Sequence, residues 1–204
     1  MIHPLTVELG KLSDSTAERV TGLLELLEKG LIHREDLPYL AASLTSLGAE
    51  QSAALVLREL AEITAQATGT IPVIPEVSRK ALDPAKVAGA VTTVLEGAAE
   101  DIPVRLHRLV RGAVTEAAQQ TRATAIRETE TYEGWTRGMD SDACQLCTWW
   151  SRDGRVWPKD HTMPTHPGCT CVQVPAISQK RLWVSDEAYE ASNIRRVAQE
   201  QANE

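Results

Sequence analysis

Four cysteines stand in two close pairs, with a histidine just before the second pair. Thiolates about two residues apart can both bind one ion at about 2.3 Å, and a tetrahedral site needs further ligands from a remote segment of the chain. The spacing therefore predicts a structural zinc site. Five side chains compete for its four positions: Cys144, Cys147, His166, Cys169 and Cys171.

The first choice of ligands combines three cysteines with one histidine: Cys144, Cys147, His166 and Cys169. Cys171 is then a replacement ligand or a thiol just behind the ligands, because on a strand it would point to the same face as Cys169. A site of all four cysteines is the close alternative. His161 comes third, since it has no partner at a ligand spacing. A Zn²⁺ ion enclosed by four protein ligands is closed to water, so we expect a structural ion rather than a catalytic one.

Other interpretations of the cysteines are buried free thiols, two disulfides or a redox-active pair. Disulfides are typical of secreted proteins, whereas the first residues lack the basic region and apolar run of a secretory signal. A thioredoxin-like pair would sit in a βαβ pattern, which does not surround Cys144 and Cys147. A small module with few aliphatic residues needs a cross-link such as a disulfide or a metal ion to fold. A zinc site is therefore favoured over the other interpretations. We expect Trp149, Trp150 and Trp157 to pack around the metal site, with base stacking as the functional alternative.

The composition predicts the elements that must position this cluster. Hydrophobic residues make up 43% of the 204 residues, aromatic residues only 4%, and phenylalanine is absent. Such a composition favours helices. The net charge of −7 argues against a protein whose main task is to wrap nucleic acid. No uninterrupted apolar run reaches the roughly 18 residues of a membrane span. We find no phosphate loop, nucleophile elbow or zincin motif, and we expect no enzyme.

The expected fold class is mostly α, with a small zinc-stabilised, β-rich (α+β) module near the C-terminus. Three short helices are predicted before residue 70: one opened by a capping box at Ser15–Glu18, one over about 35–48 and one over about 50–69. Glycines at Gly30, Gly48 and Gly69 would end them. The predicted organisation is a helical bundle over 1–69, an extended proline-containing linker over 70–82, a long helical segment over 83–131, the zinc module over 132–178 and a C-terminal helix within 179–204.

Within 83–131, Asp83 and Pro84 predict a helix start, and Pro103 is expected to break that helix after Ile102. A two-faced helix over about 104–130 follows. One face carries apolar residues and the other carries five arginines: Arg105, Arg108, Arg111, Arg122 and Arg127. The arginine face is either ordinary solvated surface or a contact for a nucleic-acid backbone or an acidic partner. Short strands are expected at about 133–137, 155–157 and 170–174.

The order of residues in the module resembles the C-terminal module of phage Mu protein F-like minor head proteins, also called head morphogenesis proteins. The resemblance rests on an aromatic strand, two acidic residues, the first cysteine pair, a glycine turn and a proline–histidine–cysteine segment: Gly134–Arg137, Asp140, Asp142, Cys144, Cys147, Gly154 and Pro164-x-His166-Pro167-x-Cys169-x-Cys171. The family commonly has arginine between its last two cysteines, where this chain has Thr170. Any contact made by that arginine therefore does not carry over.

The resemblance implies a minor capsid protein of a tailed phage, acting at or near the portal in capsid assembly and in DNA packaging or delivery. The implied partners are portal, capsid or scaffold proteins and packaged DNA, with no membrane. The implied location is the virion, at the capsid interior or portal vertex, and the host cytoplasm during assembly. The alternative from the residues alone is a nucleic-acid-binding or regulatory protein with a zinc module.

Overall fold

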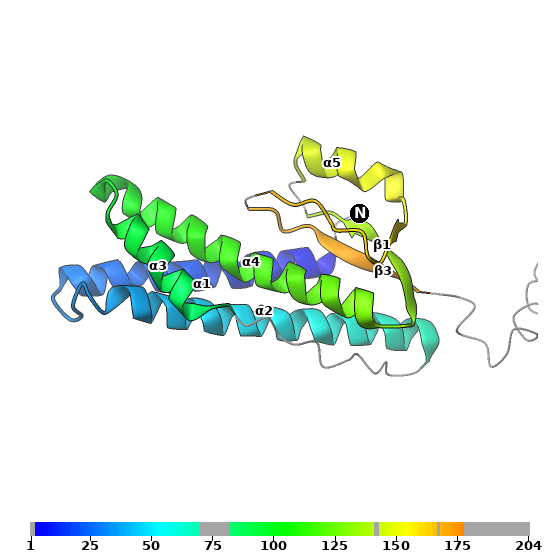
Figure 1. Ribbon diagram of the computed structural model, residues 1–204, viewed down its shortest axis with the longest axis horizontal. Coiled ribbons are helices and arrows are strands. Elements are labelled where there is room, and N and C mark those ends of the chain that lie inside the picture. The colour runs from blue at the N-terminus through cyan, green and yellow to red at the C-terminus, as the bar shows by residue number, and fades with distance from the viewer. Residues whose placement is uncertain (1–2, 70–81, 141–142, 167, 178–204) are drawn as a thin grey trace, which may run out of the picture.

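The structure is a computed structural model that describes residues 3–69, 82–140, 143–166 and 168–177. Long helices form a bundle, and a small sheet with one short helix covers one end of it (Figure 1). The predicted fold class, mostly α with a small β-rich module near the C-terminus, is confirmed. The predicted linker over 70–82, apart from its last residue, and the C-terminal helix lie outside the described residues.

Two long helices form a hairpin, where three short helices were predicted. Helix α1 spans Pro4–Glu28 and α2 spans Leu37–Thr68. The capping box at Ser15 was wrong, because α1 already begins at Pro4 and Ser15 lies inside it. The glycine ends at Gly30 and Gly69 are confirmed by their left-handed φ angles of 68° and 71°.

Gly48 lies inside α2 and does not end a helix. A Cβ atom at this position would lie 2.6 Å from Oγ1 and 2.7 Å from Cγ2 of Thr16 in α1. The absence of a side chain at Gly48 therefore permits the close approach of α2 to Thr16 of α1. The two helices predicted on either side of this glycine are one continuous helix.

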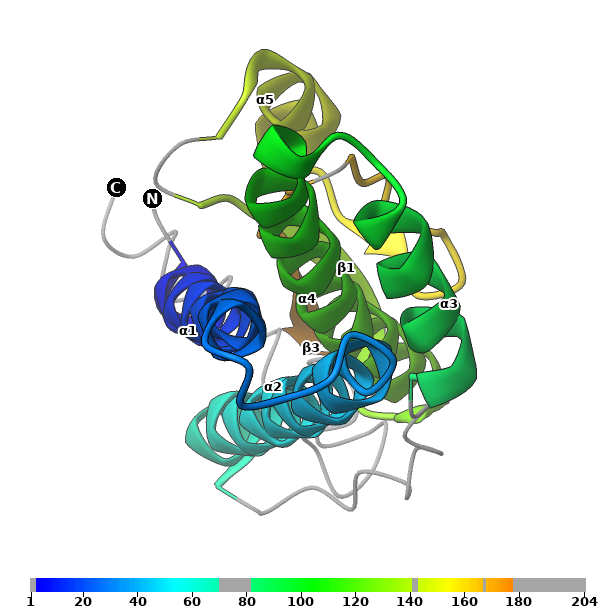
Figure 2. The same ribbon diagram turned by 90° about the vertical axis from the view of Figure 1, so that its left-hand side faces the viewer.

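The rest of the bundle consists of α3 (Pro84–Leu95), a short 3-10 turn η1 (Ala99–Asp101) and α4 (Ile102–Glu128). Asp83 caps α3 as predicted, accepting a hydrogen bond from the N–H of Ala85 at 3.0 Å. The expected helix break after Ile102 was wrong: α3 ends at Leu95, and Pro103 lies in the first turn of α4, where its missing N–H costs nothing. Figure 2 shows α4 between α1, α2 and α3.

The sheet has three antiparallel strands in the order β2-β1-β3. Strand β1 spans Tyr132–Gly138, β2 spans Trp157–Pro158 and β3 spans Val172–Ile177. All three strands overlap their predicted positions. The segment between β1 and β2 also contains a short helix, α5 (Gln145–Ser151), and a 3-10 turn, η2 (Arg152–Gly154), which the sequence analysis did not predict.

Two apolar cores follow the long axis of the bundle. One is built only from helices, with buried residues such as Val20, Leu37, Val91 and Leu106. The other is shared by helices and sheet, because Leu9, Leu60 and Ile126 pack with buried residues of the strands: Tyr132, Trp135 and Val172. The β-rich module therefore rests on the bundle through a common core.

Helix α2 is the one described helix that is long and apolar enough, by length and composition, to cross a membrane. A core helix meets the same criteria. Here α2 packs against α1, α3 and α4, and its Val56 and Leu60 are fully buried among them. Its apolar character is accounted for by this packing.

Candidate metal centre

All five predicted ligands converge on one place beside α5. Two overlapping groups have their donor atoms within 4.8 Å of one another: Cys144, Cys147 and His166, and Cys147, Cys169 and Cys171. The Sγ atoms of Cys144 and Cys147 each lie 3.2 Å from Nε2 of His166, and the Sγ atoms of Cys147 and Cys169 are 3.6 Å apart. Donors bound tetrahedrally at about 2.1–2.3 Å are roughly 3.5–3.8 Å apart. The separation of Cys147 and Cys169 fits ligands of one ion, and the two separations from His166 are slightly shorter than that range.

Local backbone structure presents these side chains. Cys144 is the extended N-cap residue of α5, and Cys147 follows within the first turn, so their side chains reach the same point. A tight turn joins the other ligands: the N–H of Cys169 donates to the carbonyl of His166 at 3.0 Å, and Gly168 between them has φ 80°. Glycine adopts this left-handed conformation at little cost.

The thiols influence one another's ionisation. Burial raises the pKa of the Cys147 thiol to about 12. A hydrogen bond with Cys171, together with burial, raises the pKa of Cys169. That hydrogen bond, supported by the backbone N–H of Asp140, lowers the pKa of Cys171 to about 5. The cluster alone therefore favours one thiolate, and a bound cation would supply the charge that the remaining thiols need to ionise.

A buried arginine faces the sulfur atoms. The guanidinium of Arg137, in β1, points toward the Sγ atoms of Cys147 at 3.6 Å and Cys169 at 4.0 Å, and it also donates to the carbonyl of Pro164. It lies 5.4 Å from the ring centroid of Trp150. Among the described residues it forms no ion pair with a carboxylate. A buried cation requires an anionic partner, and thiolates are the groups placed to provide it.

Arg137 was not predicted as part of the site, although its place in the sequence carries a signal. It lies two residues after Trp135 on a predicted strand, and period-two alternation places both side chains on the buried face. An arginine on that face must meet a negative charge.

Further contacts tie the ligand loop to its surroundings. The side-chain amide of Gln119, in α4, donates to the carbonyls of Cys169 and Cys171 at 2.9 and 3.2 Å. The hydroxyl of Thr170 donates to Oδ2 of Asp140 at 2.6 Å. Thr170 thus fixes the loop through a carboxylate acceptor.

Of the three tryptophans predicted to surround the cluster, Trp150 does so and two do not. Trp150 packs against the buried cysteines. Trp149 is 60% exposed. Trp157 belongs to a separate aromatic stack, with its ring centroid 4.4 Å from that of His161. His161, the third-choice ligand, lies in that stack and not in either ligand group.

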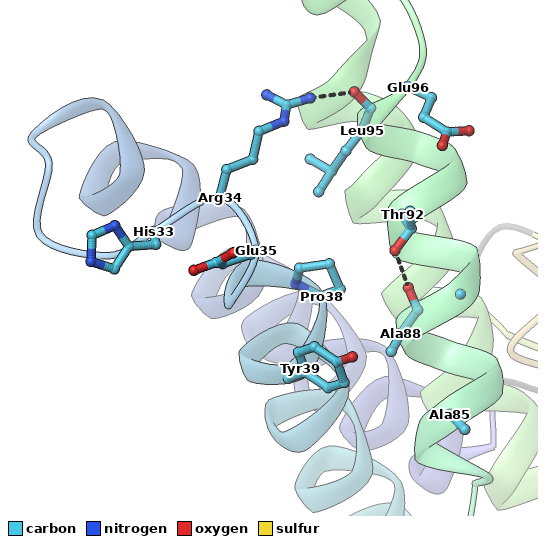
Figure 3. Close-up of a pocket in the computed structure, with 11 residues that line it drawn as sticks. His33, Arg34, Glu35, Pro38, Tyr39, Ala85, Ala88, Thr92, Leu95 and Glu96 are labelled. Carbon is cyan, nitrogen blue, oxygen red and sulfur yellow. Dashed lines mark hydrogen bonds between the residues drawn. The ribbon is translucent and has the colours of Figure 1, made fainter.

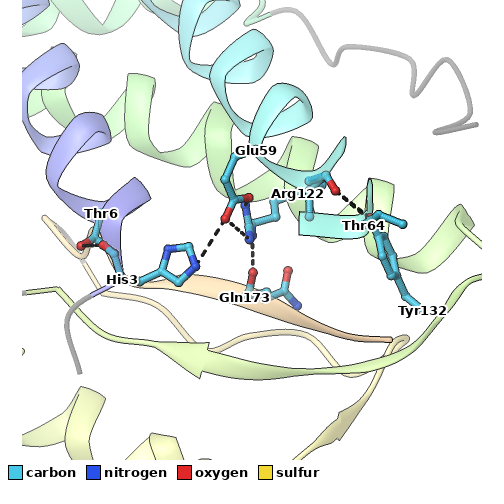
Figure 4. Close-up of polar contacts among 8 residues, drawn as sticks. His3, Thr6, Glu59, Thr64, Arg122, Tyr132 and Gln173 are labelled. Atoms are coloured by element: carbon cyan, nitrogen blue, oxygen red, sulfur yellow. Dashed lines mark hydrogen bonds and ion pairs between the residues drawn. The ribbon is translucent and has the colours of Figure 1, made fainter. Parts of the chain in front are cut away.

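The five arginines of α4 do not form one free face. Arg122 is 1% exposed; it pairs with Glu59 at 2.6 Å and donates to the backbone carbonyl of Gln173 (Figure 4). Arg111 pairs with Asp14 of α1 at 2.9 Å. The other three are exposed: Arg105, Arg108 and Arg127.

An open cavity of about 840 Å³ lies elsewhere, between the start of α2 and α3. Its lining includes Pro38, Tyr39 and Ala88, and Arg34 at its edge donates to the carbonyl of Leu95 at 2.7 Å (Figure 3). None of the five ligands lines it.

Comparison with known proteins gives one match. A family model described as VG15 protein matches residues 5–199, which include both the bundle and the metal centre. No curated protein matches the chain, and no solved structure does.

Proposed function

This chain belongs to the VG15 protein family, and from that premise we propose that it is a minor capsid (head morphogenesis) protein of a tailed phage that acts at or near the portal. VG15 is a family of viral and phage gene products, so membership indicates a phage protein of the virion or the host cytoplasm. The finer assignment is supported by the cysteine–histidine order of the module, which resembles Mu protein F-like minor head proteins. The role is one of assembly, without catalysis and without a membrane.

The metal centre is proposed to hold one structural Zn²⁺. The observation that carries this is the pair of overlapping three-donor groups that share Cys147, beside Arg137. Three thiolates and one neutral imidazole around Zn²⁺ give a net charge of −1, which the guanidinium of Arg137 balances. Four thiolates would leave −1 after that balance. The electrostatics therefore favour His166 among the four ligands.

The bundle offers a docking surface for an assembly partner. Large apolar side chains are exposed around the α1–α2 connection, among them Leu31 at 69%, Tyr39 at 71% and Leu40 at 39%. Exposed apolar groups clustered in one region are typical of protein contacts. The proposed occupants are portal, capsid or scaffold proteins, with packaged DNA as a further contact inside the capsid.

Two measurements test the proposal. Elemental analysis of protein purified under reducing conditions without chelator is expected to give one zinc per chain, and Cys147→Ser should lose it. Co-expression with the portal of the same phage should give co-purification that Tyr39→Ser weakens and Glu18→Ser, a change elsewhere on the exposed surface, leaves intact. Absence of the protein from purified virions, together with failure to co-purify with the portal, would contradict the assembly role, whatever the zinc content.

The alternative is a nucleic-acid-binding or regulatory protein with a zinc module. The exposed side chains of Arg105, Arg108 and Arg127 favour it. Binding to DNA with a steep salt dependence, lost in Arg108→Glu, would support this alternative. The buried Arg122 and the paired Arg111 reduce the number of phosphates that the helix could contact.

A further inference from the structure

A second polar cavity lies on the side of α4 near the loop that follows β2. Its volume is about 390 Å³, and it is lined by the C-terminal half of α4, residues 159–162 and Gln173 of β3. It shares no lining residue with the metal centre. Small-molecule sites have volumes of roughly 300–1,000 Å³, so the cavity is large enough for a small polar ligand.

Gln173 contributes a side-chain amide to the lining of the cavity. This residue is only 2% exposed. Its backbone carbonyl accepts a hydrogen bond from Arg122, but its side-chain amide has no hydrogen-bond partner among the described residues. Neither amide atom is among the fully buried side-chain atoms that have no partner, so the amide is reached through the cavity. A ligand that enters the cavity can bond its donor and acceptor atoms.

His161, which also lines the cavity, is held in place by neighbouring residues. The ring of His161 stacks on Trp157 with an interplanar angle of 10°. The backbone carbonyl of His161 accepts from the indole N–H of Trp135 at 3.0 Å, and its N–H donates to the carbonyl of Pro158 at 3.0 Å. Two hydrogen bonds therefore fix the backbone of His161, and stacking on Trp157 fixes its ring.

The lining side chains are mainly hydrogen-bond donors with a positive balance. Arg127 and Lys159 oppose one carboxylate, that of Asp160, which gives a formal charge of +1 with His161 neutral. Lys159 forms no ion pair among the described residues, and Arg127 pairs only with its exposed neighbour Glu128. An exposed pair of this kind is weak, and an anion can compete with it.

We propose that this cavity binds a phosphate group, either as inorganic phosphate or as the phosphate of a mononucleotide. Lys159, His161 and Gln173 all line this cavity, and a phosphate offers acceptor oxygens to the donors that their side chains carry. The proposal is independent of the metal centre and of the assembly role.

The test titrates the full-length, metal-loaded protein by NMR at constant ionic strength. The probes are inorganic phosphate, deoxyadenosine 5′-monophosphate and deoxyadenosine. Both phosphates are expected to shift the amide signals of residues 159–162 and the indole N–H signal of Trp157, and deoxyadenosine is not. Equal affinity for the two phosphates would identify the free ion as sufficient, and tighter binding of the nucleotide would show that its sugar or base also contributes.

Variants decide whether the cavity is responsible. Lys159→Met should weaken phosphate binding by about tenfold or more, since it removes a charged donor. Lys86→Met, which removes an exposed lysine from α3, should have no effect. Gln173→Leu should also weaken binding, and the surface variant at Lys159 keeps the test valid if that buried change impairs folding. Unchanged binding in Lys159→Met, or shifts produced equally by deoxyadenosine or only by a DNA oligonucleotide, would overturn the proposal.

Discussion

Arg122 joins three elements through its side chain. It extends from α4, pairs with Glu59 of α2 and donates to the backbone of β3 at Gln173 (Figure 4). Removing one member of a buried ion pair leaves the other charge without compensation. We therefore expect Arg122→Met to lower the free energy of unfolding by about 3 kcal/mol, measured by urea denaturation.

The matched control lies on the same helix. Arg127 pairs with Glu128 at 3.0 Å, but both side chains are about half exposed. Arg127→Met should cost no more than about 1 kcal/mol, as is usual for an exposed pair. Similar losses in the two variants would show that burial does not strengthen the role of Arg122.

His3 should make stability depend on pH. Burial lowers its pKa below the ordinary value; Glu59, 3.3 Å from its Nε2 atom, acts in the opposite direction, and Arg122 adds to the lowering. The unfolded chain therefore binds a proton at a pH where the folded chain does not, and the contribution of His3 to stability is lost as the pH falls below about 6.5. We expect His3→Gln to flatten the loss of stability between about pH 7 and pH 5, measured by denaturation at each pH.

His33 provides the comparison for this experiment, because it is exposed. His33→Gln should leave the pH dependence as it is in the unmodified protein. If His3→Gln gives the same curve as His33→Gln, the pH dependence arises from other groups.

At the residue scale, the sequence predicted which cysteines and histidine group together, but not the burial of Arg122. Cysteine spacing reports metal ligation because chelation constrains it directly. A helical wheel separates apolar from charged residues, yet it does not show that α2 and β3 cover the charged side of α4 near its C-terminal end. The burial of Arg122 depends on its contacts with Glu59 and Gln173, which are 63 and 51 residues away in the sequence.

At the scale of elements, the contact of Gly48 with Thr16 sets how closely α1 and α2 pack. Alanine is favoured over glycine within a helix by about 1 kcal/mol. At this position, however, the added Cβ would meet both γ atoms of Thr16, whose hydroxyl is also bonded to the carbonyl of Leu12 at 2.8 Å. We expect Gly48→Ala to destabilise the protein by about 1–2 kcal/mol, since overpacking typically costs about 1–3 kcal/mol.

Two further variants identify the cause. Gly22→Ala, in α1, introduces a Cβ with no atom within 4 Å, and it should stabilise by up to about 1 kcal/mol. Adding Thr16→Ala to Gly48→Ala should recover part of the loss. Chemical denaturation of the four proteins measures both effects, and a stabilising Gly48→Ala would contradict the close contact.

Element boundaries were predictable where local chemistry sets them. Asp83 before Pro84 and the left-handed Gly69 act within a few residues, and both were predicted. Gly48 was misjudged because the same residue type ends helices and permits close packing, and only the partner helix distinguishes the two uses. Helix α5 was not predicted because it has only seven residues, and its two tryptophans have no particular helix preference.

At the scale of the whole molecule, the metal centre and the bundle meet through a limited set of contacts. Gln119 bonds to the ligand loop, and the sheet shares a core with α1, α2 and α4. The other core contains no residue of the module. The cysteine cluster itself has little apolar packing beyond Met139, Ala143 and Trp150. If the cluster holds the proposed Zn²⁺, its local structure therefore depends on that ion far more than the bundle does.

Removal of the metal should consequently unfold the ligand-bearing segment and leave the long helices intact. Structural zinc contributes about 10–16 kcal/mol in small peptides, whereas the described residues around the cysteines have little apolar packing of their own. We expect a chelator to change tryptophan fluorescence, because Trp150 loses its contacts, while far-ultraviolet circular dichroism retains most of its helical signal. Added zinc should restore the fluorescence, and Cys147→Ser should already resemble the chelated protein. Loss of the helical signal together with the fluorescence change would instead show that the ion stabilises the whole molecule as one cooperative unit.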